Sequence, residues 1–349
     1  MKLNKLKYEL IIIIIFFLLK FLFFKKKTVG VIGLEHSQNV GNNLLKFAMF
    51  IKLSKLGYSP LIVGKQYHNN DISFINNTIN IRLIKNFSEI NEKDFDILMV
   101  NSDQTWRKGI DDFHNVAFLK FAENWTKTKF TYGTSLGVEK WEYSKMDNKI
   151  AKYLLKNFTG ISVRESYAIQ LIEKHLGFKA QLVLDPTFLI DKKYYLNLIK
   201  NFKSDIINKI NNNNFIFSYI LSNTIQIQNF LSNIEKELQL KIFYLTIDDK
   251  NQVKEFLYGI SHCKAVITDS FHGTIFSIMF KKPFISFQKY SIDSRFKSLD
   301  EIFNIKNRIY NINSTPPISL LNQPLIINDT KLLSLKIQSI NYLKKNLNS

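Results

Sequence analysis

Cysteine is nearly absent from this sequence, since Cys263 is the only one in 349 residues. A single thiol cannot form an intramolecular disulfide, and there is no CxxC pair or Cys/His set for structural zinc. Six prolines and a hydrophobic content of 46% also exclude a disordered or proline-rich chain. We therefore expect the fold to be held by packing, in one large or two medium-sized cores.

Arginine is also scarce, although the formal net charge is +19. Most of this charge is lysine spread along the chain, with no basic helix and no arginine-aromatic patch, so no nucleic-acid partner is expected. The arginines are more informative, because a guanidinium group binds carboxylates and phosphates through paired hydrogen bonds. Arg82 lies in an ordinary apolar run. The other four fall in candidate loops: Arg107, Arg164, Arg295 and Arg308.

The longest hydrophobic run is LIIIIIFFLLKFLFF, residues 10–24, with lysines on both sides. It is shorter than the roughly 20 residues that span a bilayer comfortably, but flanking lysines can reach the interfaces. We therefore predict an N-terminal hydrophobic helix, in which residues 1–27 form a single membrane anchor with membrane contact through residues 8–27. A cleaved signal peptide and an extra core element are the alternatives. The orientation stays open, because both flanks are positive.

After this run, short apolar stretches alternate with helical segments, a pattern typical of βα units and parallel sheets. An asparagine-rich polar stretch interrupts the alternation, which then begins again. The sequence therefore predicts an α/β protein with two Rossmann-like lobes and a ligand site in the cleft between them. The predicted segments are residues 28–200 and 215–325 for the lobes, 201–214 for the linker and 326–349 for a terminal helix.

The loop TDSFHG, which ends at Gly273, carries the strongest chemical signal. It lies between a predicted strand and a helix predicted over 274–280, so free backbone N–H groups can face an anion. His272 can exchange a proton near neutral pH, and Asp269 and Ser270 stand beside it. Alternatively, Asp269 or Ser270 is only a helix cap and His272 is a packed surface ring.

Arg164, at the end of a strand in SVRES, is the predicted anion clamp. We expect it to face His272 across the cleft, with Arg295 contacting substrate or orienting the second lobe. Alternatively, Arg164 forms an ion pair with Glu165 or Asp185.

The loop NSDQTW offers a carbohydrate-binding surface. Asp103 and Gln104 can bind sugar hydroxyls while the indole of Trp106 stacks on a sugar ring. The alternative is a helix cap with Trp106 in the core. Further on, a short cluster contains Asp111, Asp112 and His114, but a solvated loop explains it better than a metal site.

Taken in order, these loops resemble the polysaccharide pyruvyl transferase family over about residues 28–310. The sequence departs from the family pattern at Asn101, where glycine is usual, and at Arg107, where asparagine is common. The matching segments are NVGNNLLKFAMFIKLSKLGY, NSDQTW, FLKFA, FTYGTSLG, ISVRES, VLDPTFLI, VITDSFHGTIFSIMFKKPFISF and SRFKSLDEIFNIKNRI.

The resemblance implies a two-lobed, GT-B-like transferase. It would move a pyruvyl group from phosphoenolpyruvate to two hydroxyls of one sugar in a glycan or glycan lipid, leaving a cyclic ketal. Arg164 and the helix start at Gly273 would hold the donor, and His272 would protonate the methylene carbon or bind the phosphate.

In the same scheme, Asp269 would orient His272, and Asp103 or Asp185 would be the base for the acceptor. No cofactor and no metal are predicted. A glycosyltransferase of the same shape that uses a nucleotide sugar is the rival enzyme, and an inactive, membrane-tethered binding protein is the alternative that is not an enzyme.

Overall fold

A computed structural model describes residues 26–33, 39–65, 78–101, 103–203, 214–222, 224–245, 251–289 and 294–349. The hydrophobic run of the predicted anchor lies outside these ranges, as does most of the predicted linker. Within the described part, no helix combines the length and apolar character needed to cross a bilayer. The predicted N-terminal helix and its membrane contact therefore stay predictions.

The first sheet contains five parallel strands in the order β3-β2-β1-β4-β5. Central β1 pairs with β2 and with β4, so that Val29 lies opposite both Pro60 and Ile97. All four residues of β4 are buried, as expected for a strand covered on both faces. The strands are β1 (Thr28–Ile32), β2 (Ser59–Lys65), β3 (Ile81–Ile84), β4 (Ile97–Val100) and β5 (Thr128–Thr131).

A two-stranded parallel pair, β6 (Ser162–Val163) and β7 (Gln181–Leu182), extends this lobe. It joins the chain that follows β5 through a parallel bridge between Thr134 and Val163. After β7 the chain turns into the 3₁₀ helix η4 (Pro186–Leu189), which Asp185 caps.

The second sheet is also parallel, in the order β12-β11-β10-β8-β9. Its central β10 pairs with β8 and β11, which places the TDSFHG loop in the middle of the carboxyl edge of the sheet. The strands are β8 (Phe215–Tyr219), β9 (Lys241–Leu245), β10 (Ala265–Thr268), β11 (Phe284–Gln288) and β12 (Ile309–Asn311).

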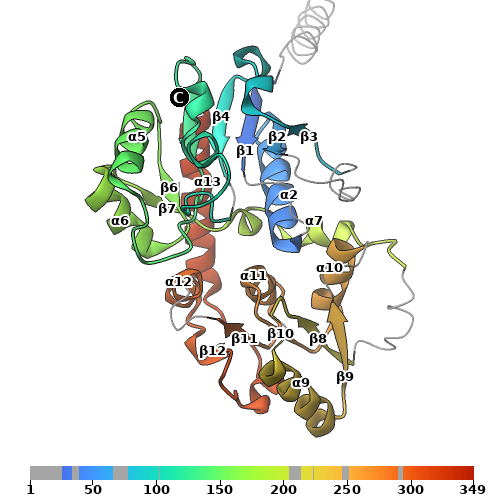
Figure 1. The fold of residues 1–349 in the computed structure, drawn as a ribbon. Coiled ribbons are helices and arrows are strands. Elements are labelled where there is room, and N and C mark those ends of the chain that lie inside the picture. Colours follow the sequence, from blue (N-terminus) through green and yellow to red (C-terminus); the bar gives the residue numbers. More distant parts are fainter. Residues whose placement is uncertain are drawn as a thin grey trace, which may run out of the picture.

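Figure 1 shows the two sheets in separate lobes, with α2 and α11 where the lobes meet. Helix α2 of the first lobe contacts α10 and α11 of the second. The helices of the first half are α2 (Val40–Lys55), α4 (Phe113–Phe118), α5 (Lys145–Leu155), α6 (Ser166–Leu176) and α7 (Lys192–Asn197). Those of the second half are α9 (Ile225–Leu238), α10 (Gln252–His262), α11 (Phe271–Met279), α12 (Ser294–Phe303) and α13 (Asp329–Leu347).

The terminal helix α13 returns to the first lobe (Figure 1). The hydroxyl of Tyr342 donates to the carbonyl of Thr131 at 2.8 Å, and Thr159 Oγ1 donates to Asn346 Oδ1 at 3.0 Å. A Cβ on Gly160 would lie 2.3 Å from that Asn346 oxygen. The glycine therefore permits the close approach of α13 to the first lobe.

Helix α12 was not predicted, because its sequence SRFKSLDEIF has only a few apolar residues. It buries serines as well as phenylalanines, since it packs against α6 of the other lobe. The amide of Ser166 donates to Ser298 Oγ at 3.3 Å, and Ser294 Oγ donates to the hydroxyl of Tyr167 at 3.0 Å. This helix therefore carries Arg295 directly to the edge of the first lobe.

Candidate active site

His272 lies in the first turn of α11, which begins three residues earlier than predicted. Ser270 is the N-cap, and its side chain accepts from the amide of Gly273 at 3.3 Å. A Cβ on Gly273 would lie 2.3 Å from Thr268 Oγ1, so glycine lets this helix pack tightly on the end of β10. The amide of Gly273 is therefore not free in this structure, whereas anion binding at the start of this helix stays a prediction.

The ring of His272 packs against the first turn of α2 in the other lobe. A Cβ on Gly41 would lie 2.2 Å from Nδ1 of His272. His272 is 3% exposed, and its Nε2 has no hydrogen-bond partner among the described residues. The acid beside this ring is Asp185, whose Oδ2 is 3.8 Å from that Nε2. The NVGNN segment of the first lobe thus fixes the position of a ring from the second lobe.

Arg164 lies beside this histidine and joins two acids of the first lobe. Its Nη1 donates to Asp185 Oδ2 at 2.6 Å, and its Nη2 donates to Asp103 Oδ1. Arg164 therefore forms the ion pair with Asp185 that was the alternative, and it also lies near His272, while its role as an anion clamp stays a prediction. Its guanidinium carbon is 4.6 Å from the ring centre of Phe271.

Arg295 brings a second guanidinium group to the same place from α12. Its Nη1 is 3.2 Å from Asp103 Oδ2, and its guanidinium carbon is 5.1 Å from the ring centre of Phe271. One carboxylate, that of Asp103, therefore bridges an arginine from each lobe over a shared aromatic face. A carboxylate or phosphate of a ligand can bind the same two guanidinium groups in the place of Asp103.

Burial and the guanidinium groups set the protonation of this cluster. Burial disfavours the charged form of Asp103, but Arg164 and Arg295 outweigh it and hold the pKa of Asp103 below its ordinary value. Burial lowers the pKa of His272, against the opposing effect of Asp185 and Asp103. The imidazole is therefore neutral at pH 7, and Asp103 is a weak base.

Glu165 is a part of the cluster that the sequence did not single out as functional. It is completely buried, and burial raises its pKa to about 7, against the opposing effect of Arg164. Ser135 Oγ donates to its Oε1. Its position directly after Arg164 is the only sequence signal that could have indicated it.

Asp269 takes a different place from the one expected. Its two carboxylate oxygens accept from the backbone amides of Leu221 at 2.6 Å and Ser222 at 2.8 Å. It therefore holds the turn after β8, and the acid close to His272 is Asp185. The expectation that Asp269 orients His272 is wrong for this geometry, since both of its oxygens are committed elsewhere.

Replacing Asp269 should consequently affect stability more than chemistry. Asp269→Ala removes the charged acceptor of one exposed and one partly buried amide, and we expect a loss of about 1–3 kcal/mol in the free energy of unfolding. Denaturant titration measures this loss, and turnover at a temperature where the variant is folded should fall less than tenfold. A much larger fall in turnover with unchanged stability would show that Asp269 takes part in catalysis.

The sugar-stacking role predicted for Trp106 is also wrong. Its side chain is fully buried, its Nε1 donates to the carbonyl of Ala117 at 3.0 Å, and its ring packs at 5.4 Å from that of Phe118. Gln104 accepts from Arg107 Nη1 at 2.8 Å at the surface. Among the described residues of the NSDQTW segment, Asp103 is therefore the one that reaches the cluster.

The remaining arginines and acids have structural roles. Arg308 is buried and donates to four backbone carbonyls of the second lobe, those of Phe284, Leu320, Gln323 and Pro324. Asp112 pairs with Lys65, and His114 Nε2 lies 3.0 Å from Asp147 Oδ1. In the described ranges, no group of three or more His, Cys, Asp or Glu residues is placed to hold a metal ion.

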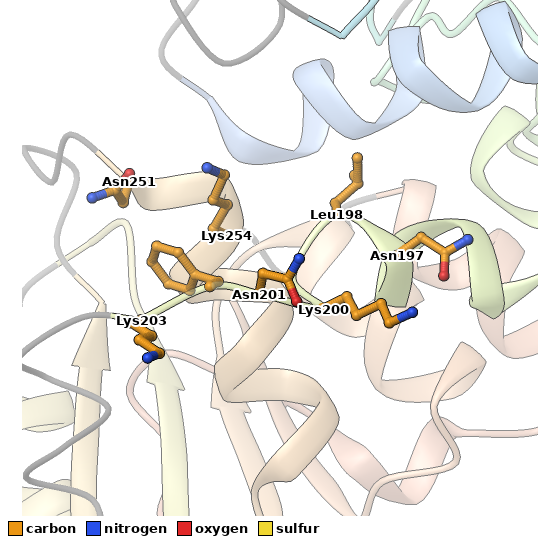
Figure 2. Close-up of a pocket in the computed structure, with 8 residues that line it drawn as sticks. Asn197, Leu198, Lys200, Asn201, Lys203, Asn251 and Lys254 are labelled. Atoms are coloured by element: carbon orange, nitrogen blue, oxygen red, sulfur yellow. The ribbon is translucent and has the colours of Figure 1, made fainter.

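An open pocket of about 590 Å³ lies away from this cluster, between the end of α7 and the start of α10 (Figure 2). Three lysines line it, Lys200, Lys203 and Lys254, and Lys254 Nζ lies 5.6 Å from the ring centre of Phe202. The acids and histidine of the Arg164 cluster do not reach it. It is therefore a positively charged surface without the groups needed for proton transfer.

Solved structures with a similar fold are distant in sequence. The UDP-GlcNAc 2-epimerase from Methanocaldococcus jannaschii has a TM-score of 0.56 and 12% identity, covering 89% of this chain and 99% of that one. The Neisseria meningitidis UDP-GlcNAc 2-epimerase bound to UDP-GlcNAc has a TM-score of 0.56 and 10% identity, covering 92% and 99%. UGT89C1 from Arabidopsis thaliana has a TM-score of 0.53 and 10% identity, covering 93% and 98%. These likenesses support an α/β fold with parallel sheets of the GT-B glycosyltransferase and epimerase class, and nothing finer.

No curated protein matches the chain in a sequence search. The family model described as "Polysaccharide pyruvyl transferase" matches residues 39–288. This range includes α2 with Gly41, the Asp103 loop, Arg164 and the first turn of α11, while Arg295 lies just beyond it. By this match over most of its length, the chain belongs to the polysaccharide pyruvyl transferase family.

Proposed function

We propose that this protein transfers a pyruvyl group from phosphoenolpyruvate to a sugar of a glycan or glycan precursor and releases phosphate. The observation that carries the proposal is that arginines from both lobes, Arg164 and Arg295, bind one carboxylate beside the buried His272, whose Nε2 makes no hydrogen bond to any described residue. A donor with a carboxylate and a phosphate suits this pair of guanidinium groups.

The donor has to compete for the arginines with the acids of the protein itself. The cavity lined by Arg164, Phe271 and Arg295 measures only about 10 Å³, room for about one water. We infer that the carboxylate of the donor replaces that of Asp103, which already satisfies the same hydrogen bonds. Asp103 is therefore a placeholder for the donor in this structure, and its depressed pKa makes it a poor base for the acceptor.

His272 is the better candidate for proton transfer. Because its imidazole is neutral, it can accept the proton of the first sugar hydroxyl as that oxygen bonds to C2 of the donor. In the same step the ring passes this proton to C3, so that no free carbanion forms and C3 becomes the methyl group. The second hydroxyl forms the other C2–O bond, the bond from C2 to the phosphate oxygen breaks, and the last proton leaves with phosphate or solvent.

The test is incubation of the full chain with phosphoenolpyruvate and a panel of galactosides and aminosugars. Phosphate release and the mass of the ketal product measure turnover. We expect His272→Ala to reduce turnover by roughly 10²–10⁴-fold, as is usual for loss of a general acid-base group. The matched control is Lys203→Ala in the pocket of Figure 2, which should leave turnover unchanged.

The rival function, a transferase that uses a nucleotide sugar, is supported by the fold alone. Thermal protection of the chain by UDP-GlcNAc, with none by phosphoenolpyruvate, would favour that rival. Full turnover by His272→Ala would contradict the role given to this residue.

A further inference from the structure

Glu165 occupies an unusual position for an acid. It precedes the first residue of α6 but makes no side-chain cap bond, and it is completely buried. Its Oε1 accepts from Ser135 and lies 3.5 Å from Arg164 Nε. Its Oε2 and that Arg164 Nε are buried and lack hydrogen-bond partners among the described residues. An ionised carboxylate is costly in such a place, because half of it receives no donor.

The charges around Glu165 do not balance when every acid is ionised. The facing groups come from several elements: Asp103 after β4, Ser135 after β5, Arg164 after β6, Asp185 before η4, His272 on α11 and Arg295 on α12. Three carboxylates then meet two guanidinium groups and a neutral imidazole, an excess of one negative charge. A donor that carries several negative charges would increase this excess.

We propose that Glu165 is a positioning residue that takes up a proton when the anionic donor binds. The neutral Glu165 then no longer competes with the donor for the positive charge of Arg164. This inference rests on the proposed function. The proton comes from solvent, and the carboxylate becomes a neutral carboxyl group, which is less costly in this buried position than an ion that lacks a donor on one oxygen. Glu165 does not touch the reacting atoms and acts through Arg164.

Protonation of Glu165 costs little free energy near neutral pH. Burial raises the pKa of Glu165 to about 7, whereas Ser135 and Arg164 favour the charged form. A bound anion raises this pKa further, because a nearby negative charge disfavours the carboxylate. Donor affinity should therefore fall as pH rises above about 7, since Glu165 must then be protonated from the ionised state.

The experiment is titration calorimetry of the full chain with phosphoenolpyruvate between pH 7 and 8.5, in buffers of different ionisation enthalpy. The phosphate of the donor is largely ionised in this range, so it contributes little proton uptake. We expect uptake of close to one proton at pH 8 and a Kd that rises up to about tenfold per pH unit. Glu165→Gln, which keeps the shape and an acceptor for Ser135, should bind with a nearly pH-independent Kd and little proton uptake.

Two further variants separate this role from a structural one. Ser135→Ala removes a hydrogen bond to the charged form of Glu165, so the pH dependence of Kd should move to higher pH. Glu142→Gln, at an exposed position on the surface, should show the same proton uptake and the same pH dependence of Kd as wild type. The Ser135 result keeps the proposal testable if Glu165→Gln does not fold.

Several outcomes would overturn the inference. Donor binding without proton uptake would do so, as would unchanged uptake in Glu165→Gln. Uptake that disappears in His272→Gln but persists in Glu165→Gln would assign the proton to the histidine instead. An absence of phosphoenolpyruvate binding at every pH would reject the proposed function itself, and the inference with it, whereas the other outcomes leave that function standing.

Discussion

Gly41→Ala should reduce turnover by about a hundredfold or more, although alanine is the better helix former. The substitution lies in the first turn of α2, where alanine gains up to about 1 kcal/mol of helix propensity. The new Cβ, however, would lie 2.2 Å from Nδ1 of His272, so the ring must move. Misplacing a reacting group by about 1 Å can cost this much in rate.

The matched control for this variant is Gly160→Ala. Its Cβ would make a similarly close approach, 2.3 Å, to Asn346 Oδ1 at the contact with α13, far along the fold from His272. Both variants should lose about 1–3 kcal/mol from overpacking. Only Gly41→Ala should lose turnover when both are assayed as folded protein.

A double variant makes the test sharper. In Gly41→Ala with His272→Ala, the removed ring leaves room for the new Cβ. We expect no further loss of turnover beyond that of His272→Ala, together with recovery of the stability lost in Gly41→Ala. Fully additive losses in both turnover and stability would show that Gly41 and His272 act independently.

Arg164→Lys should be the most damaging conservative change in the chain. A lysine keeps the charge but has no planar fork, so it cannot bind Asp103 and Asp185 together while covering the Phe271 ring. We expect donor affinity to weaken at least about a hundredfold and stability to fall by about 3–5 kcal/mol, since buried acids lose their partner. Calorimetry and denaturant titration measure the two effects.

Arg107→Lys is the control for this change. Arg107 is exposed and contacts Gln104 at the surface, so its loss should alter stability by less than about 0.5 kcal/mol and leave donor binding intact. Equal effects of the two substitutions would contradict the donor-binding role of Arg164. A stability loss with unchanged donor affinity would restrict Arg164 to holding the lobes together.

The sequence predicted the strands and helices well where local patterns decide them. The alternation of short apolar stretches and helical segments predicted parallel sheets in two lobes, and the structure contains a five-stranded parallel sheet in each lobe. Helix α12 was missed because its buried face uses serines that contact another lobe, a partner that apolar periodicity does not reveal. The start of α11 was placed too late, because Gly273 was interpreted as a turn residue although it lies within the helix.

Residue types identified part of the candidate site. Arg164 and His272 stood out because arginine and histidine are rare here and follow strands, and the structure places both at one cluster. Trp106 and Asp269 have the same kind of sequence context, yet one is in the core and the other holds a turn. Their side-chain directions depend on distant backbone, on Ala117 and on Leu221, so no local pattern distinguishes the two outcomes.

By itself, the sequence determined the α/β alternation and the family, because these follow from periodicity and motif order, and its few arginines predicted an anionic ligand. Only the tertiary structure decided which groups act together. It placed Gly41 under His272, put Asp103 between two arginines and enclosed Glu165 without enough donors. The reason is that protonation and positioning depend on burial and on charges from both lobes, and these neighbours are far apart along the chain.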